Sequence, residues 1–432
     1  MRPTPLAAKF GGSLMWSALA AIATQGFTLA TNWIAANQLT RDDMGRFAVA
    51  MTTVVSASTI GQLALGLTIN RYVAEFRVNE PARANRVLGV GSAVAIASAV
   101  LCGGVAYALA PSLAVFLRDS SMTTPLRVAA LLLMAHLLGG VQIGVLSSVQ
   151  RFDLTAMVAF ASAAVALPAV WWACRSFGLL GAVSAAAAAQ LLRSVALWAV
   201  ARYAIRQAGL RFDLSQPHSE APLLIHFALP ASLSGLTAPP AIWFANSTLA
   251  RLPGGFGEAG SFAVAATFQT AAMFVPNLTS RLSATLLSEQ RGLRSARGER
   301  DVFLLSAVCG AAALAFVAVA IALFAGPLLS LFGKAYPETA RNALLVLLLA
   351  SVPEFLTITL DQFVQLEGKM WQALLFVNLP RDLTLSLTCL PMAASAGAMG
   401  LAGAYLLARL VGFAGVLWLS RANLAQLWRR TA

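Results

Sequence analysis

Charged side chains are scarce in this sequence. Asp, Glu, Lys and Arg together make up 11% of its 432 residues, whereas hydrophobic residues make up 59%. A soluble domain carries roughly 25% charged residues. The composition therefore excludes a water-soluble protein of this size and indicates that the lipid bilayer is the main solvent of the chain.

Cysteine and histidine are also rare, with four and three residues. The cysteines stand alone inside apolar stretches, at Cys102, Cys174, Cys309 and Cys389. An isolated thiol in such surroundings packs as a small apolar group, so we predict neither a disulfide nor a metal site. His136 and His226 are interpreted as packing residues, with a proton relay as the alternative.

The sequence lacks the motifs that enzymes need. It has no P-loop, no cluster of metal-ligating residues and no nucleophile with a base nearby. The polar connections are too short to build such a site, so we expect no enzyme activity and no cofactor. The net charge of +13 does not indicate nucleic-acid binding, because the basic residues are scattered over short loops.

Long apolar runs recur instead along the whole chain. Each is at least about 18 residues long, which is enough to cross a hydrocarbon core of ~30 Å. We predict an all-α polytopic membrane protein with about twelve spans, at 11–36, 46–69, 87–110, 125–149, 154–173, 178–201, 224–249, 260–285, 302–326, 342–366, 370–393 and 396–419. The first run is too long for a signal-peptide core and is interpreted as an uncleaved span.

The two halves of the chain partly repeat one another at a nearly constant offset of half the chain length. Gly45 and Phe47 return as Gly260 and Phe262, Pro111 and Phe116 as Pro327 and Phe332, and Gly181 and Arg193 as Gly397 and Arg409. We predict two pseudo-symmetric six-helix lobes around a central cavity, at 1–203 and 224–432, joined by a cytoplasmic linker at 204–223. Two similar halves are typical of a membrane transporter.

The basic residues predict the orientation. With the N-terminus in the cytoplasm, 19 basic residues lie on the inner side and 8 on the outer side. Short cytoplasmic loops carry an excess of Lys and Arg, so both termini are expected to be cytoplasmic. Because each half has an even number of spans, both enter the membrane the same way and their pseudo-symmetry axis lies along the membrane normal.

Polar side chains inside spans are costly and therefore indicate function. A charge at mid-span costs at least ~2.5 kcal/mol. We predict that a cavity binds substrate through Gln62, Asn70, Arg71, Gln269, Asn277 and Arg281. Gln62 and Asn277 occupy the same repeat position, and Arg71 and Arg281 lie toward the cytoplasmic end, where they would meet an anionic group. The alternative is that each arginine only reaches the interface.

The tenth span carries two acids. Glu354 and Asp361 are two helical turns apart and share one helix face, so they need a cation, a proton or water. We predict ion coupling or a charge pair, with Arg381 or an arginine facing the cavity as partner. A local pair of Arg381 with Asp382 is the alternative. Arg193 and Arg409, which repeat one another, are interpreted as structural.

Prolines inside spans predict kinks. Pro239 and Pro240 should break the seventh span, and Pro276 should bend the eighth, because proline removes a helix hydrogen bond. Such kinks suit a protein that changes shape to alternate its access between the two sides of the membrane.

Four segments carry a family resemblance. Residues 39–50 (LTRDDMGRFAVA) and 65–76 (LGLTINRYVAEF) resemble the opening of bacterial polysaccharide-biosynthesis membrane proteins, the lipid-linked oligosaccharide (O-antigen-type) flippases. Residues 331–336 (LFGKAY) and 397–404 (GAMGLAGA) are similar to later segments of that family. The resemblance implies a two-lobed fold of the multidrug/oligosaccharidyl-lipid/polysaccharide exporter type in the bacterial inner membrane.

The resemblance also implies a function and its partners. Such flippases move a polyprenyl-diphosphate-linked oligosaccharide from the inner to the outer leaflet for surface polysaccharides such as lipopolysaccharide. The expected partners are that substrate and membrane lipids, with a polysaccharide polymerase and glycosyltransferases. The family picture places Gln62, Arg71, Asn277, Arg281, Glu354 and Asp361 near the cavity, and Arg193 and Arg409 toward the periphery.

Two other functions stay open at this point. A cation-coupled drug or metabolite exporter of the same superfamily would use Glu354 and Asp361 as proton or sodium sites. A scaffold of an envelope assembly complex would use the buried polar residues only for packing.

Overall fold

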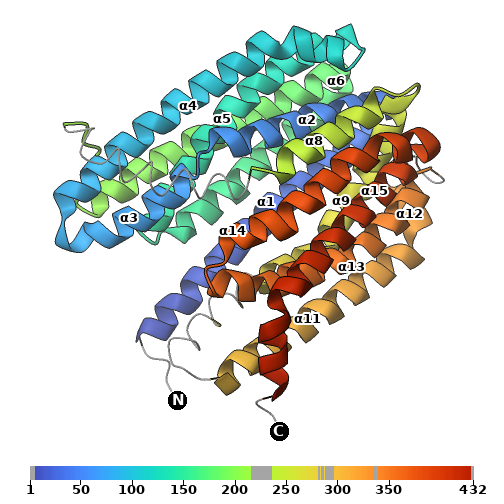
Figure 1. Cartoon of the computed structure of the whole chain (residues 1–432). Helices are drawn as coiled ribbons and strands as arrows, with labels where there is room; N and C mark the ends of the chain where they lie inside the picture. The colour runs from blue at the N-terminus through green and yellow to red at the C-terminus, as the bar shows by residue number, and fades with distance from the viewer. Residues whose placement is uncertain are drawn as a thin grey trace. The chain divides into compact units, whose positions relative to one another are not determined.

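The computed structural model describes residues 5–215, 236–280, 283, 287, 296–333, 336 and 339–429. Over these residues the regular elements are all helices (Figure 1). The first half contains α1 (Pro5–Gln38), α2 (Arg41–Gly61), α3 (Leu65–Asn79), α4 (Pro81–Phe116), η1 (Ser120–Met122), α5 (Thr123–Ser148) and α6 (Phe152–Gln207). The second half contains α8 (Ala238–Ala250), α9 (Gly255–Ala272), α11 (Ala296–Leu323), α12 (Ala325–Ser330), α13 (Thr339–Leu366), α14 (Met370–Ala373), the π-helix η2 (Leu374–Asn378) and α15 (Leu379–Arg429).

The lengths of these helices confirm a polytopic membrane protein. Six of the described helices are long and apolar enough to cross a membrane, or eight if each of two bent pairs counts as one span. The 56 residues of α6 and the 51 of α15 each exceed the ~20 that one crossing needs. The exact number of twelve spans stays a prediction.

A glycine breaks each of the two longest helices at a predicted span junction. Gly178 in α6 and Gly397 in α15 have φ values of 57° and 54°, which a side chain with a Cβ rarely adopts. Almost one turn later, a Cβ on Gly181 would meet the Ala173 carbonyl oxygen, and one on Gly400 would meet that of Met392. Gly178 is therefore the structural equivalent of Gly397, and the predicted match of Gly181 with Gly397 is wrong by almost one helical turn.

Two further spans are bent. The break between α2 and α3 turns the chain by 41°, and α9 meets the helix at 274–280 at 42°. Pro276 explains the second bend, as predicted, because its ring clashes with the carbonyl of Ala272, where α9 ends. The first bend has no proline. Leu63 and Ala64 adopt left-handed conformations there, which cost roughly 1–2 kcal/mol each.

The bends also separate the predicted pair Gln62 and Asn277. Gln62 lies in the break that follows α2, whereas Asn277 lies in the helix at 274–280, past the second break. The constant offset that related them in the sequence therefore does not hold for their places in the two bent spans. The predicted break at Pro239 and Pro240 coincides with the first turn of α8; residues 224–235 of that predicted span lie outside the described residues.

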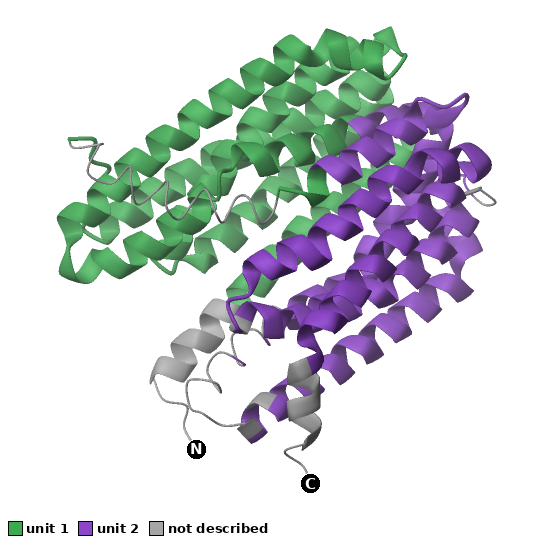
Figure 2. Ribbon diagram, viewed as in Figure 1, with its two compact units in different colours: residues 1–39, 50–239 green, residues 40–49, 240–432 purple. Residues whose placement is uncertain are grey.

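The chain forms two compact units, which differ from a simple division into halves (Figure 2). Unit 1 comprises residues 1–39 and 50–239, and unit 2 comprises residues 40–49 and 240–432. The first turns of α2 thus belong to unit 2, although the predicted N-terminal lobe of 1–203 included them.

Each unit has its own apolar core. Unit 1 is centred on α3, α4, α5 and α6, where Ile69, Leu88 and Val145 are fully buried. Unit 2 packs α11, α13 and α15 together. Between α11 and α13, the ring centroids of Phe303 and Phe363 lie 4.5 Å apart. Burial of such side chains contributes about 1.5–3 kcal/mol each in water. Inside a bilayer, close packing takes over that role.

Candidate functional site

A polar network lies inside unit 2. Glu354 of α13 accepts a hydrogen bond from Gln269 Nε2 of α9 at 3.1 Å. The same carboxylate forms an ion pair with Arg409 Nη2 of α15 at 3.0 Å. The structure therefore brings two predicted site residues, Gln269 and Glu354, together. It adds Arg409, which the family resemblance had implied to lie toward the periphery.

Two further side chains extend this network. Tyr405 lies one turn before Arg409, and its ring centroid is 5.7 Å from the Arg409 guanidinium carbon. The Tyr405 hydroxyl accepts a hydrogen bond from Asn246 Nδ2 of α8 at 3.2 Å. We call Asn246, Gln269, Glu354, Tyr405 and Arg409 the unit 2 network. It connects four helices, α8, α9, α13 and α15.

The network has unused hydrogen-bonding capacity. The Arg409 side chain is 15% exposed, and its Nη1 is buried without a hydrogen-bond partner among the described residues. A buried guanidinium nitrogen of this kind costs free energy unless an acceptor reaches it. Water or a polar group of a substrate can supply that acceptor. The network therefore offers an unused hydrogen-bond donor within the membrane.

The second predicted acid has different partners. Asp361 accepts a hydrogen bond from Gln365 Nε2 at 2.7 Å, one turn further along α13. Arg381 acts on Asp361 electrostatically, but its own ion pair is with Asp382. Arg381 Nε and Nη2 donate to the two Asp382 oxygens at 2.8 and 3.1 Å. The local pair was the predicted alternative, and among the described contacts Arg381 does not pair with Glu354.

The remaining candidates lie in separate places. Gln62 lies against Gly140 of α5, where a Cβ would be 3.6 Å from the Gln62 amide carbon. Asn70 is half-buried in α3, and Arg71 next to it is exposed, with its guanidinium 5.4 Å from the Tyr72 ring centroid.

Two more candidates belong to the second half. Asn277 is exposed, whereas Arg281 lies outside the described residues, as does His226. The roles of these side chains in substrate binding stay predictions.

Unit 1 holds a separate polar contact around Arg193. Arg193 Nη2 of α6 donates to Thr24 Oγ1 of α1 at 3.1 Å, and its charge acts on His136 of α5. Arg193 lies almost one turn further from Gly178 than Arg409 lies from Gly397, so the two arginines are not equivalent in their helices.

Three residues of the unit 2 network had not been predicted as site residues: Asn246, Tyr405 and Arg409. One feature of the sequence could have indicated two of them: Tyr405 and Arg409 are four residues apart, which puts them on one helix face.

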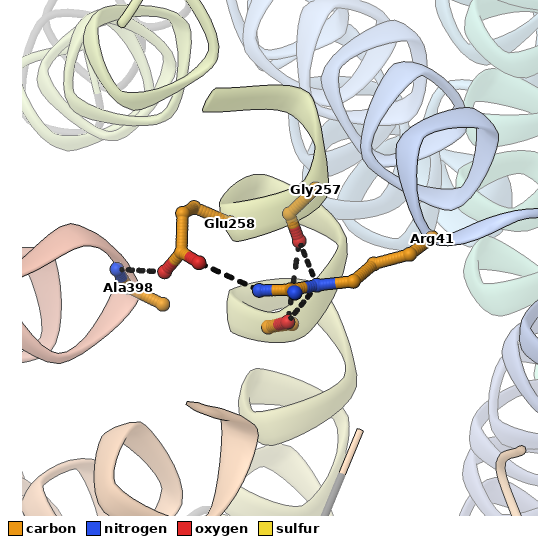
Figure 3. Close-up of polar contacts among 5 residues, drawn as sticks. Arg41, Gly257, Glu258 and Ala398 are labelled. Carbon is orange, nitrogen blue, oxygen red and sulfur yellow. Dashed lines mark hydrogen bonds and ion pairs between the residues drawn. The ribbon is translucent and has the colours of Figure 1, made fainter. Parts of the chain in front are cut away.

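A second polar cluster of unit 2 joins α2, α9 and α15 (Figure 3). Arg41 Nε donates to the Gly257 carbonyl at 2.9 Å and to Ser261 Oγ at 2.8 Å. Arg41 Nη2 pairs with Glu258 Oε1 at 2.6 Å, and Glu258 Oε2 accepts from the Ala398 backbone N–H at 2.8 Å. Glu258 thus holds the first turn of α2 and the kink of α15 at once.

Two repeat-related glycines let α2 and α9 come close at this cluster. A Cβ on Gly45 would meet the Phe256 carbonyl oxygen, and one on Gly260 would meet the Arg41 carbonyl oxygen. Arg41 and Phe256 are related by the same sequence offset as the two glycines. Each helix therefore makes the same glycine-to-carbonyl contact with the other. This close approach explains why the Gly45–Gly260 match stood out in the sequence.

A buried tyrosine adjoins the cluster, in the segment between α12 and α13. Burial raises the pKa of Tyr336 to about 12, and the nearby Arg41 charge opposes that shift. The hydroxyl therefore stays protonated at physiological pH. It has no hydrogen-bond partner within the part of the chain that the structure describes.

Replacing Glu258 with alanine is expected to lower the melting temperature of the detergent-purified protein. The change removes two charge-assisted hydrogen bonds, which contribute about 1.5–3 kcal/mol each. Glu80→Ala is the matched control, because Glu80 is exposed and pairs with Arg83 at 3.5 Å, and such surface pairs contribute about 0–1 kcal/mol. Equal melting temperatures for the two variants would contradict the role given to Glu258.

No metal site is evident: the described residues contain no group of three or more His, Cys, Asp or Glu side chains that could hold an ion.

Known proteins share sequence features with this chain. Residues 11–279 match the sequence profile of a family described as "Polysaccharide biosynthesis protein". The EPS I polysaccharide export inner membrane protein EpsE of Ralstonia solanacearum is 23% identical over 379 residues, which cover 86% of this chain and 84% of that protein.

Solved structures show the same fold. An inward-facing multidrug resistance MATE family transporter of the MOP superfamily aligns with a TM-score of 0.72 at 15% identity, over 96% of this chain and 100% of that one. The lipid II flippase MurJ, in an inward closed conformation, aligns with a TM-score of 0.71 at 11% identity, over 94% and 87%. The chain therefore has the two-lobed, all-helical membrane fold of these transporters.

Proposed function

Because the chain belongs to the polysaccharide biosynthesis protein family, we propose that it is a flippase for a polyprenyl-diphosphate-linked oligosaccharide. In this proposal it moves the glycan from the cytoplasmic to the outer leaflet of the inner membrane by alternating access, without making or breaking covalent bonds. The family match carries the proposal, and the export role in the name of the Ralstonia relative supports it.

The physical task explains why such a protein needs polar groups inside its membrane-spanning helices. Each hydroxyl that enters hydrocarbon without a hydrogen bond costs ~2–7 kcal/mol. An oligosaccharide carries many hydroxyls, while its polyprenyl tail can stay in the lipid. Amides and hydroxyls such as those of Gln269, Asn246 and Tyr405 would replace water around the sugar.

Positive charge serves the other end of the substrate. Arg71 and Arg281 are proposed to meet the diphosphate on the cytoplasmic side, because both lie at the ends of spans that the sequence places there. Arg409 would supply a hydrogen bond through its unpartnered Nη1 deeper in the membrane. The ion pair with Glu354 keeps the Arg409 side chain in place between transport events.

A cation-coupled exporter is the second candidate, and one observation favours it. Asp361 is an acid of α13 that accepts its hydrogen bond from a neutral side chain, Gln365, so it can take up a proton or cation. Glu354 suits that role less well, because Arg409 already neutralises it.

Charge reversal separates the two candidate functions. In the native bacterium, the double change Arg71→Glu and Arg281→Glu is expected to abolish surface polysaccharide and to leave the lipid-linked precursor in the inner leaflet. Immunoblots of surface glycan and extraction of the lipid-linked pool measure both effects. Full export by a variant that reaches the membrane at the normal level would refute the flippase proposal and favour an exporter of cations.

A further inference from the structure

Unit 1 contains a cavity that the proposed function does not use. It has a volume of about 660 Å³ and lies between α4, α5, α6 and the segment 208–215 that follows α6. Cavities that hold small ligands have volumes of roughly 300–1,000 Å³. Apolar side chains form most of its wall, among them Ile96, Leu138, Leu191 and Val195.

Specific contacts fix the segment that forms one wall. Asn85 of α4 accepts hydrogen bonds from two backbone N–H groups, Arg211 at its side chain (2.8 Å) and Asp213 at its carbonyl (3.1 Å). Gly89 permits this approach, because a Cβ there would meet the Asp213 carbonyl oxygen. Phe212 and Leu214 are thereby held over the cavity. The wall of the cavity is therefore held by specific backbone contacts.

The depth of the cavity matches the cytoplasmic half of a bilayer. Gln142 and Arg202 each lie about one and a half turns, or roughly 8–9 Å, before the ends of α5 and α6, which the sequence places at the cytoplasm. Ser92 lies about three turns after the start of α4, which is deeper by roughly 8 Å. Arg202 thus stands near the level of lipid headgroups.

Polar atoms without partners point to an amphipathic occupant. Ser92 Oγ and Gln142 Oε1 are buried and have no hydrogen-bond partner among the described residues, and both side chains line the cavity. Arg202 is exposed, its guanidinium carbon lies 4.6 Å from the Trp198 ring centroid, and no carboxylate of the described residues forms an ion pair with it. An apolar chain alone would leave the two buried atoms, Ser92 Oγ and Gln142 Oε1, unsatisfied.

The carboxylate of Asp213, between the lining residues Phe212 and Leu214, is already engaged. Asp213 Oδ1 accepts from the Ser215 backbone N–H at 2.9 Å. This hydrogen bond lowers the pKa of Asp213, with further help from the charges of Arg211 and Arg86. The two arginines thus offset the charge of this acid.

The outer wall of the cavity is apolar and exposed. Leu191, Val195 and Trp198 are 55%, 57% and 48% exposed on α6, and apolar side chains exposed on a membrane-spanning helix contact the bilayer. A molecule can therefore enter from the membrane without crossing the protein, and the molecules next to this wall are the phospholipids of the inner leaflet.

We propose that this cavity binds one anionic glycerophospholipid of the cytoplasmic leaflet. Its phosphate binds Arg202, a headgroup hydroxyl donates to Gln142 Oε1, and the Ser92 hydroxyl donates to an ester carbonyl deeper in the cavity. One acyl chain lies along Leu191 and Val195. The bound lipid braces the segment 208–215 against α4. This proposal does not depend on the identity of the transported substrate.

Quenching of Trp198 fluorescence tests the site. The protein is reconstituted into vesicles of phosphatidylcholine and phosphatidylglycerol in equal parts, with bromine on the acyl chains of one lipid or the other. The Trp198 signal is the difference between the wild type and Trp198→Phe. We expect brominated phosphatidylglycerol to quench it at least threefold more efficiently than brominated phosphatidylcholine. Trp172, which is 59% exposed on α6 outside the cavity, is the matched control and is expected to show a ratio near one.

Two variants separate the parts of the site. Arg202→Gln is expected to bring the ratio for Trp198 to near one, because the charge that selects the phosphate is gone. Ala93→Phe fills the cavity and is expected to lower quenching by both lipids. Equal quenching by the two lipids in the wild type would overturn the proposal. Native mass spectrometry provides a second measurement: the wild type should retain one phosphatidylglycerol after delipidation, and retention by Arg202→Gln as well would also overturn it.

Discussion

Glu354→Leu is expected to destabilise the protein by about 3 kcal/mol and to abolish glycan export. The change leaves the Arg409 guanidinium mostly buried without its carboxylate, and a buried charge without a partner is strongly destabilising. It also frees the amide of Gln269 from its acceptor. Thermal unfolding in detergent measures the first effect, and surface polysaccharide in the complemented deletion strain measures the second.

A double variant distinguishes a structural pair from a functional one. Glu354→Leu combined with Arg409→Leu removes both charges, and apolar replacements of a buried pair are often neutral for stability. We expect stability to return close to that of the wild type while export stays absent. The double variant Arg381→Leu and Asp382→Leu is the matched control, because it removes another ion pair of unit 2 and should leave export intact. Recovery of export in the Glu354 and Arg409 double variant would show that the network serves packing alone.

Gly45→Leu is expected to have the second large effect. The new Cβ would overlap the Phe256 carbonyl oxygen, so the first turn of α2 cannot keep its place on α9. Arg41 would then lose its contacts with Gly257, Glu258 and Ser261. Overpacking typically costs about 1–3 kcal/mol, to which the lost charged hydrogen bonds add. Melting temperature and the yield of folded protein by size-exclusion chromatography measure the loss.

The pseudo-symmetry of this contact supplies an internal check. Gly260→Leu is expected to be as harmful as Gly45→Leu, because its Cβ would overlap the Arg41 carbonyl oxygen in the corresponding way. Gly104→Leu is the control, since a Cβ at Gly104 has no atom within 4 Å and the residue is exposed on α4. If all three variants have the same melting temperature, the close helix contact does not contribute to stability.

The sequence was sufficient to predict the fold class but not the register of the repeat. Apolar runs long enough to span a bilayer identify the membrane helices, and the Gly45–Gly260 match marks a contact where only glycine fits. At one constant offset, residue type alone pairs Gly397 with Gly181. The structure shows that Gly178 is its true equivalent, since both carry the positive φ of a kink. Backbone conformation, which residue types alone do not specify, decides which positions of the two halves are equivalent.

The broken spans show a second limit. Pro276 predicted the bend after α9, because any proline lacks a backbone N–H donor and its ring clashes with the carbonyl four residues earlier. The break after α2 depends on Leu63 and Ala64 in left-handed conformations, which neither residue type favours. The surrounding packing must impose such a conformation, so no local pattern could have revealed it.

The partner of Glu354 could not be found from the sequence for a similar reason. A helical period tells which residues share a face of α13, but not which neighbouring helix that face meets. Arg381 and Arg409 were both available, and they lie on opposite sides of the kink at Gly397. The structure pairs Arg381 with its neighbour Asp382 and brings Arg409 to Glu354.

Translocation by the purified protein tests the central proposal most directly. Proteoliposomes are prepared with a fluorescent polyprenyl-diphosphate oligosaccharide in both leaflets, and a membrane-impermeant reductant or lectin reports the fraction that becomes accessible. With the wild type, nearly all of the labelled lipid should become accessible, whereas protein-free vesicles and Glu354→Leu/Arg409→Leu should stop at about half. If the folded wild type also stops at the level of protein-free vesicles, this protein is not the flippase.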